Sequence, residues 1–277
     1  MAEISAAAVK QLREQTDMPM MMCKQALTEA GGDFDRAVSV LKEKAGKRLE
    51  KRTENTTNEG RIFLKLAGDG SRAAMVEVQC ESAPVAGSES LAQLGEALVS
   101  QLLNGPGAKT GEELLAQPGP GGRTLADLFT EISSKIQEKI VVNRVARLDA
   151  PLGTYVHHDG KTAVLFQAAG APKNADVLRD VAMHIAAMRP NVTNVTDLNP
   201  AVVQAERDRL SAEAAASGKP AAVIEKMVEG RLKGFYRDDA GVLVEQPFAK
   251  DDKKSVGQVL KDNGCEAKQF VAWRLGK

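Results

Sequence analysis

Cysteine and histidine are the side chains of this sequence best suited to nucleophilic, acid–base or metal chemistry, and both are rare. The cysteines are Cys23, Cys80 and Cys265, and the histidines are His157, His158 and His184. The cysteines are far apart and odd in number, which fits neither a disulfide framework nor a zinc ligand set. Cysteine usage of this kind is typical of a protein from a reducing, cytoplasmic environment.

No motif joins these side chains into a catalytic site. His157 and His158 flank a predicted turn, where we expect them to be exposed. No glycine-rich loop has the spacing of a phosphate cradle. Cys23 and His184 would be a nucleophile and a base, but no local signature supports that pair. The sequence therefore predicts a protein that uses no cofactor and no metal and makes or breaks no covalent bond.

The stretch 75–87 changes from a strand into a loop and then into a helix. Residues 75–80 alternate with the period of two that is typical of a half-buried strand. Ser82 can accept a hydrogen bond from a backbone N–H one turn on, and Pro84 lies where a first helical turn has no N–H to lose. A capping box is predicted at Ser90. Local patterns thus indicate a strand-to-helix connector with ordinary caps, and a loop that inserts into a partner is the alternative.

Residues 4–45 have the pattern of three short helices, separated at 16–19 and 31–32. About forty residues is near the lower limit for an autonomous core, so a compact module over 1–45 is predicted. The segment 46–59 is rich in charge and poor in apolar residues, which is typical of a linker. Because no aromatic side chains interleave its charges, solvated surface is favoured over nucleic-acid contact.

A unit of two strands and a helix occurs twice in the middle of the chain. The predicted elements are 60–66, 74–80 and 91–103 in the first unit, and 153–157, 162–168 and 174–188 in the second. A longer helix is predicted between them, from 124 to 142. The duplication indicates an α+β fold whose first core subdomain spans 60–148.

The second core subdomain is predicted to be interrupted by an arm. Residues 149–198 and 237–277 would form the subdomain, with strands at 242–244 and 269–275 around a helix at 256–262. The insertion 199–236 carries two helices joined by a tight connection around Gly218, which predicts an antiparallel helical hairpin. Its faces are thin in large apolar residues, so we expect it to protrude and to be available to a partner.

The balance of charge argues against two classes of partner. Lys plus Arg and Asp plus Glu number 37 each, so no global basic field attracts nucleic acid or anionic membrane. No apolar run approaches the length of a membrane span, and the first residues lack the apolar core of a signal peptide. We therefore expect a soluble cytoplasmic protein without direct nucleic-acid or membrane partners.

Ordered blocks of the sequence resemble bacterial elongation factor Ts. The N-terminal block includes Met20-Met21-Met22-Cys23-Lys24-Gln25-Ala26-Leu27, a second block is Ala182-Met183-His184-Ile185-Ala186-Ala187, and others lie at 12–16, 217–220, 225–231, 246–248 and 255–258. The resemblance spans essentially the whole chain. It implies a UBA-like N-terminal module, a duplicated core, a coiled-coil arm and no C-terminal helical extension.

The resemblance also implies an activity, which is guanine-nucleotide exchange on the GTPase elongation factor Tu. A member of the family binds the GDP form of that GTPase, loosens GDP and magnesium, and yields to GTP. Exchange of this kind needs differential contact rather than covalent chemistry. The oligomeric state stays open, with a homodimer or a 2:2 complex among the alternatives.

Partner contacts are implied for Arg13, for the pair Met20 and Met21, and for His184. Arg13 would pair with an acidic group, and the alternative is a solvated arginine. The methionines would form an adaptable apolar surface, and the alternative is that they fill the core of the module. His184 would press on the GTPase near its phosphate-binding loop, although a histidine on a helix is more often structural.

The loop Ser82-Ala83-Pro84-Val85 would also contact the partner, and here the sequence departs from the family, whose members typically carry Thr-Asp-Phe-Val. The usual phenylalanine wedges into a pocket of the GTPase, and the aspartate acts near its magnesium region. Loss of a buried aryl group costs about 3–5 kcal/mol if nothing compensates. The alternative function is therefore a chaperone-like module that binds elongation factor Tu but exchanges weakly. The turn Asp17-Met18-Pro19 likewise replaces a glycine-containing turn of the family.

Overall fold

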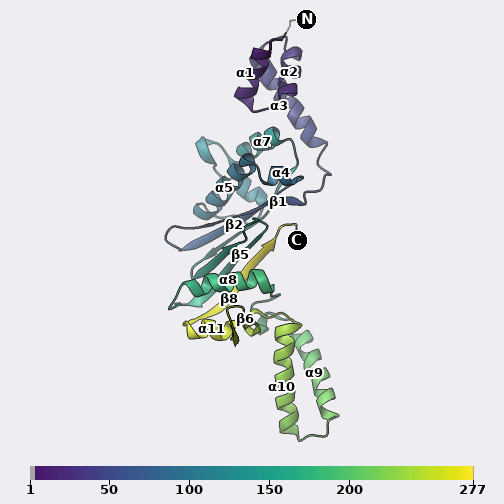
Figure 1. Cartoon of the computed structure of the whole chain (residues 1–277), viewed down its shortest axis with the longest axis vertical. Helices are drawn as coiled ribbons and strands as arrows, with labels where there is room; N and C mark the ends of the chain where they lie inside the picture. Colours follow the sequence, from purple (N-terminus) through teal and green to yellow (C-terminus); the bar gives the residue numbers. More distant parts are fainter. Residues whose placement is uncertain (1–3, 277) are drawn as a thin grey trace. The chain divides into compact units, whose positions relative to one another are not determined.

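The computed structural model describes residues 4–276, which form two compact units (Figure 1). The first consists of residues 4–65, Ala74–Ala146 and residues 275–276, and the second consists of Leu66–Ala73 and Arg147–Arg274. Helices accompany small antiparallel sheets, so the α+β class predicted from the sequence is confirmed. Within residues 4–276, no helix is long and apolar enough to cross a membrane.

Three helices open the first unit: α1 (Ala6–Thr16), α2 (Met20–Glu29) and α3 (Phe34–Glu50). Ser5 caps α1 by accepting the Ala8 N–H, and Asp33 caps α3 by accepting the Arg36 N–H. The helices share one apolar core, built from residues that include Leu12, Cys23, Ala26, Leu27 and Leu41. Because α3 continues to Glu50, residues 46–50 of the segment expected as a linker are helical.

A three-stranded sheet in the order β1-β2-β3 follows in the first unit. Its strands are β1 (Glu59–Leu66), β2 (Arg72–Cys80) and β3 (Ile140–Asp149), and the helices between β2 and β3 are α4 (Ala83–Ala86), α5 (Glu89–Asn104), α6 (Gly111–Leu115), η1 (Pro120–Gly122) and α7 (Leu125–Ile136). Gly95 faces the Phe63 ring so closely that a Cβ atom there would overlap with it. The absence of a side chain at Gly95 therefore allows α5 to approach β1.

Two sequence predictions for the first unit are wrong. The helix predicted over 124–142 ends at Ile136, where Gln137 takes a left-handed conformation with φ 58°, and Ile140 already begins β3. Ile140 is buried in the strand as it would have been in a helix, so apolar spacing did not separate the two outcomes. The cap of α5 is Ser88 rather than Ser90, since the Ser88 side chain accepts the Leu91 N–H.

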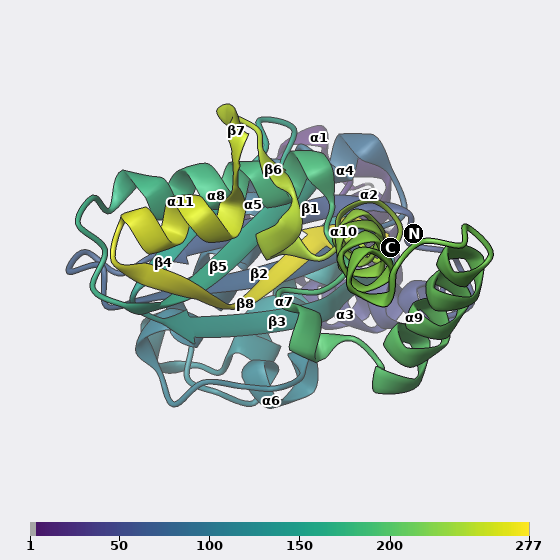
Figure 2. The same ribbon diagram turned by 90° about the horizontal axis from the view of Figure 1, so that it is seen from below.

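The second unit contains the antiparallel sheet β4-β5-β8, with β4 (Leu152–Val156), β5 (Thr162–Gly170) and β8 (Cys265–Arg274). Figure 2 shows α8 (Asp176–Met188) and α11 (Val256–Asp262) on the same side of this sheet. Their inner faces form one buried cluster with the sheet, which includes Phe166, Val181, Ile185, Val256 and Leu260. Gly153 permits this packing, because a Cβ atom there would overlap with the carbonyl of Leu178 on α8.

Two long helices, α9 (Pro200–Ala215) and α10 (Ala221–Asp238), run side by side in Figure 1. Asn199 caps α9 by accepting the Ala201 N–H, and Leu210, Ala214, Val228 and Leu232 form a small core between the two helices. The rest of the unit contains η2 (Val195–Asp197), η3 (Leu243–Glu245), β6 (Pro247–Phe248) and β7 (Asp251–Ser255).

The strand predicted at 242–244 is also wrong, because most of this segment lies in η3. Val242 makes only an isolated bridge to Val192. The Leu243 N–H donates to the carbonyl of Val192, and the Glu245 N–H turns back to the carbonyl of Val242. Val242 and Leu243 are thus buried without a strand partner along their length, and Val244 is half-buried.

Candidate functional site

The loop that follows β2 is held by two glutamates. Glu138 accepts two hydrogen bonds from Ser82, one from its N–H at 3.1 Å and one from its hydroxyl at 2.7 Å. In return, Glu81 accepts the N–H of Lys139 at 2.6 Å. Each glutamate therefore binds the backbone next to the other one. We call Glu81, Ser82, Glu138 and Lys139 the glutamate clamp.

Additional donors surround the Glu81 carboxylate. Arg52 donates to it at 2.6 Å and Asn55 at 2.8 Å. Burial acts to raise the pKa of Glu81, but the N–H of Lys139 and the side chains of Asn55 and Arg52 outweigh burial and hold that pKa below its usual value. Glu81 is therefore ionised at neutral pH, and part of the positive charge of the 46–59 segment is paired within the chain.

The Cys80 thiol points to the same loop. It donates to the carbonyl oxygen of Ser82 at 3.3 Å, and burial raises the pKa of Cys80 to about 11. A protonated thiol is a poor nucleophile, so Cys80 acts as a weak hydrogen-bond donor. Ser82 does precede α4, but its hydroxyl makes no cap bond to that helix. The predicted capping role of its side chain is wrong, because Glu138 takes the hydroxyl instead.

The surface that the loop presents is small and apolar. Ala83 and Pro84 are exposed, and Val85 is half-buried. The helix α4 that carries them has no buried residue. The loop therefore offers the Pro84 ring to its surroundings without an aromatic ring or a carboxylate at these positions.

The two methionines at the start of α2 are exposed, Met20 to 49% and Met21 to 65%. Met18 is the methionine of this turn that fills the core, so the core-filling alternative is wrong for Met20 and Met21. Asp17 has φ 54° and ends α1 in the left-handed conformation, a backbone geometry that favours glycine. Arg13, one turn earlier on α1, is exposed as well.

The end of α7 and the short segment 137–139 that joins it to β3 touch both of these regions. The amide of Gln137 donates to the Met22 sulfur at 2.7 Å, and Lys135 pairs with Asp17 at 3.3 Å. Glu138 then binds Ser82, as described above. The first unit thus connects the methionine turn and the loop after β2 through one short segment. Sequence reasoning missed Gln137 and Glu138, because it assigned them to the interior of a long helix.

His184 lies on α8 in the second unit and is only 1% exposed. The N–H of Ala249 donates to its Nδ1 at 3.2 Å, so the ring proton is on Nε2, which is 3.0 Å from the amide oxygen of Gln246. Burial lowers the pKa of His184, although the bond to Gln246 acts in the opposite direction. A second ring proton would sit on Nδ1 and face the Ala249 N–H, so two donors would oppose each other. The ring is therefore neutral and fully engaged within the chain.

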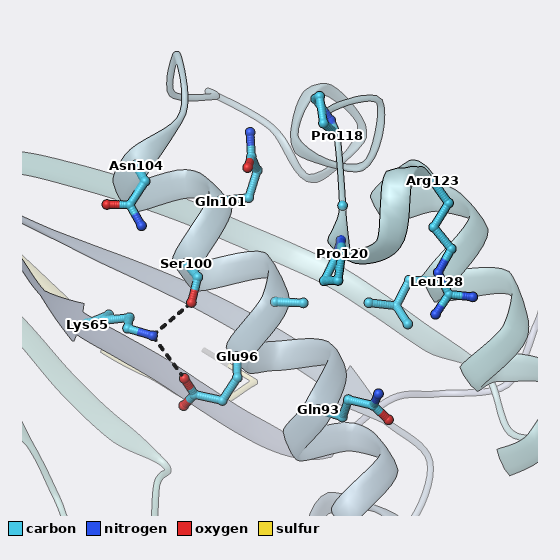
Figure 3. A pocket seen from close by; sticks show the side chains of 12 residues that line it. Lys65, Gln93, Glu96, Ser100, Gln101, Asn104, Pro118, Pro120, Arg123 and Leu128 are labelled. Carbon is cyan, nitrogen blue, oxygen red and sulfur yellow. Dashed lines mark hydrogen bonds and ion pairs between the residues drawn. The ribbon is translucent and has the colours of Figure 1, made fainter.

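A pocket of about 600 Å³ lies between β1, α5 and the start of α7 (Figure 3). Lys65 points into it and binds Ser100 at 2.8 Å and Glu96 at 3.6 Å. Arg123 on its opposite wall is paired with Glu131. The charges around this pocket are neutralised locally, and none of the residues singled out from the sequence lines it.

The cysteines and histidines of the described chain belong to no metal-binding cluster. Residues 4–276 contain no group of three or more His, Cys, Asp or Glu that could hold a metal ion. The Cys23 thiol donates to the carbonyl of Met18, and burial raises the pKa of Cys265. His157 contacts the Tyr155 hydroxyl at 2.9 Å.

Comparison with known proteins identifies what the chain is similar to. The model of the family described as "Elongation factor TS" matches residues 84–277. A curated relative named "Elongation factor Ts" from Aquifex aeolicus (strain VF5) is 38% identical over 286 residues, covering 99% of this chain and 98% of the relative. Another of that name, from Bordetella avium (strain 197N), is 40% identical over 281 residues, covering 100% of this chain and 93% of the relative.

Proposed function

Since the chain belongs to the elongation factor Ts family, we propose that it is a guanine-nucleotide exchange factor that binds elongation factor Tu in its GDP form and promotes GDP release. The observation that carries this proposal is the similarity over 99% of the chain and 98% of the relative from Aquifex aeolicus. In that role the chain is an elongation factor acting in cytoplasmic protein synthesis, and it needs no cofactor of its own.

The proposed activity is a coupling free energy between two ligands of the GTPase. If the factor weakens GDP binding by some ratio, GDP weakens binding of the factor by the same ratio. A ratio of one hundred corresponds to about 2.7 kcal/mol. Binding contacts that fit only the open nucleotide site are sufficient to supply this, so no covalent step is required.

We place the contact surface of the first unit on two exposed regions. One is the loop Ser82–Val85, where Pro84 and Ala83 are exposed, and the other is the pair Met20 and Met21. Flexible methionines adapt to a partner surface at little cost. Arg13 is exposed near this turn and is available to pair with a carboxylate of the GTPase.

His184 is proposed to contribute from the second unit. The family resemblance assigns it a contact with the GTPase, but its ring is buried beneath the segment 246–249. Direct contact therefore requires that segment to move, which would break the hydrogen bonds to Gln246 and Ala249. Without such a move, His184 acts by holding the segment against α8.

The remaining assignments follow the family. We propose that residues 1–45 are a UBA-like module whose last helix continues to Glu50, that the linker is limited to 51–58, and that 60–148 and 149–198 with 237–277 are the duplicated core subdomains. The helices α9 and α10 within 199–236 would form the coiled-coil arm. A homodimer or a 2:2 complex with the GTPase is distinguished from a 1:1 complex by light scattering of the mixed proteins.

The test is release of a fluorescent GDP analogue from elongation factor Tu of the same organism. We expect micromolar concentrations of the chain to accelerate release well above the spontaneous rate. A boiled sample and an equal concentration of albumin serve as controls. The proposal fails if the rate does not rise with the concentration of the chain.

A second function is favoured by the loop itself, where Ala83 and Pro84 stand in place of the usual aspartate and phenylalanine. In this alternative the chain binds elongation factor Tu as a chaperone-like module and exchanges nucleotide weakly. Tight complex formation without faster GDP release supports it over the exchange factor. Affinity for RNA that falls steeply with salt would instead indicate that residues 42–53, at the charged end of α3 and the start of the linker, bind nucleic acid.

A further inference from the structure

The helix α4 that presents Pro84 lacks the usual means of being held in place. It is a single turn from Ala83 to Ala86 and has no buried residue. An isolated turn of this length is unstable by itself, because helix nucleation is unfavourable. Its position must therefore be set by the residues at its ends.

Ser82, which precedes α4, has every polar group engaged. Its N–H and hydroxyl both donate to Glu138, and its carbonyl accepts the Cys80 thiol at 3.3 Å and the Ala86 N–H at 3.1 Å. Two of these four bonds end on one carboxylate. Charge-assisted hydrogen bonds of this kind are stronger than those between neutral groups.

Glu138 itself is anchored by its neighbours in the chain. Gln137 precedes it and binds the Met22 sulfur, and Lys139 follows it and donates its N–H to Glu81. The Lys139 ammonium also donates to the carbonyl of Asn55 at 3.0 Å. Glu138 is thus presented by a segment that is bonded on both sides, while the loop it binds depends on it.

We propose that Glu138 is a positioning residue for the partner-binding loop. It acts through Ser82 to fix where α4 presents Ala83 and Pro84, and it does not itself contact the GTPase. This inference rests on the proposed function, in which that loop contacts elongation factor Tu. If the loop moved freely, only a fraction of the molecules would hold it in the arrangement that binds. The apparent affinity for the GTPase would fall by that fraction.

The test measures GDP release against factor concentration for the full chain and for Glu138→Ala, Glu138→Gln, Ser82→Ala and the double variant Ser82→Ala/Glu138→Ala. Glu138→Ala should raise the concentration for half-maximal rate about tenfold and leave the rate at saturation nearly unchanged. Ser82→Ala keeps its N–H and should show a smaller rise. The double variant should match Glu138→Ala, because the two changes remove the same contact.

Glu138→Gln provides the rescue. Its amide oxygen can accept one of the two bonds from Ser82, so its half-maximal concentration should lie between those of the full chain and Glu138→Ala. Glu96→Ala is the matched control, since that carboxylate pairs with Lys65 on the wall of the pocket in Figure 3. It should leave the half-maximal concentration unchanged.

Hydrogen exchange of the Ala86 amide in the free chain tests the same idea without the GTPase. That amide is bonded to the Ser82 carbonyl, and its exchange should become faster in Glu138→Ala but not in Glu96→Ala. If the unaltered chain does not accelerate GDP release from elongation factor Tu, the proposed function fails. The exchange rate of the Ala86 amide then decides by itself whether Glu138 positions the loop. The positioning role of Glu138 is overturned if Glu138→Ala leaves the half-maximal concentration unchanged or leaves the Ala86 amide equally protected. A lower melting temperature of Glu138→Ala would not rescue it.

Discussion

Replacement of His184 distinguishes two roles for this residue, a buried structural histidine and a histidine that contacts a partner directly. The ring is 1% exposed, and its two nitrogens bind the Ala249 N–H and the Gln246 side chain. His184→Ala removes both bonds and leaves a cavity next to the Phe248 ring, whose centroid is 5.9 Å from that of His184. His184→Asn keeps an oxygen in the place of Nδ1 and loses only the bond to Gln246.

The expected magnitudes follow from these contacts. An unsatisfied buried polar group costs about 1–3 kcal/mol, and with the cavity His184→Ala should lose about 2–4 kcal/mol of unfolding free energy. His184→Asn should lose about 1–2 kcal/mol. With the slope usual for urea, the alanine variant should unfold at a midpoint lower by about 1–2 M.

The single tryptophan of the sequence, Trp273, is a suitable reporter because it lies buried in β8 of the same unit, opposite Ala163 of β5. Urea unfolding followed by its fluorescence gives the two midpoints, and GDP release at low urea gives the activity. We expect His184→Ala to slow release about tenfold and His184→Asn to slow it less, in proportion to stability.

Two results would contradict this reasoning. An alanine variant with the wild-type urea midpoint would show that the hydrogen bonds to Gln246 and Ala249 contribute nothing. An asparagine variant that is stable yet as slow as alanine would show that the imidazole is needed for contact with the GTPase. In that case the segment 246–249 must open in the complex, and its amide hydrogen exchange should slow or quicken on binding.

Three further predictions concern the loop, the pH dependence and the packing of α8. Pro84→Phe and Ala83→Asp should each change the rate of GDP release by less than about threefold, because we expect the loop to match its own partner. This change is smaller than the loss expected for His184→Ala. A tenfold gain in rate with Pro84→Phe would refute the prediction. Burial holds the pKa of His184 below its usual value, so the neutral ring contributes its full stability above about pH 6.5. That stability is lost as the pH falls through the pKa of the unfolded chain and then through that of the folded chain. The urea midpoint should therefore be lower at pH 5.5 than at pH 8, and the difference should be smaller in His184→Asn. Gly153→Ala should destabilise the second unit by about 1–3 kcal/mol, because the added Cβ overlaps with Leu178. Gly230→Ala on α10 meets open space and should stabilise that helix by about 0.5–1 kcal/mol. Thermal melts followed by circular dichroism measure both effects.

Much of the fold could be predicted because its signals are local. The helix at 256–262 and the strands at 60–66 and 162–168 have the predicted type, since apolar spacing and capping residues act within a turn or between neighbouring residues. The errors fall where local patterns are ambiguous. Ile140 fits a helix that continues from α7 as well as a strand, and only its pairing in the sheet distinguishes them.

The candidate site was predicted less completely, and the reason is distance along the chain. Met20, Met21 and Pro84 are exposed, and their contact with a partner stays a prediction. The partners of Ser82 and His184 had no local signal, because Glu138 is 56 residues from Ser82, and Gln246 is 62 residues from His184.

The sequence by itself determined the α+β class, most of the helices and strands, and the resemblance to elongation factor Ts, but it missed β3 and placed a strand where η3 lies. It also showed that Ala83 and Pro84 replace the usual aspartate and phenylalanine. Only the tertiary structure decided that Glu138 holds the loop containing them and that His184 is a buried, neutral ring. Periodicity and capping depend on neighbouring residues, whereas a hydrogen-bond partner and the burial of a side chain depend on which distant segments meet when the chain folds.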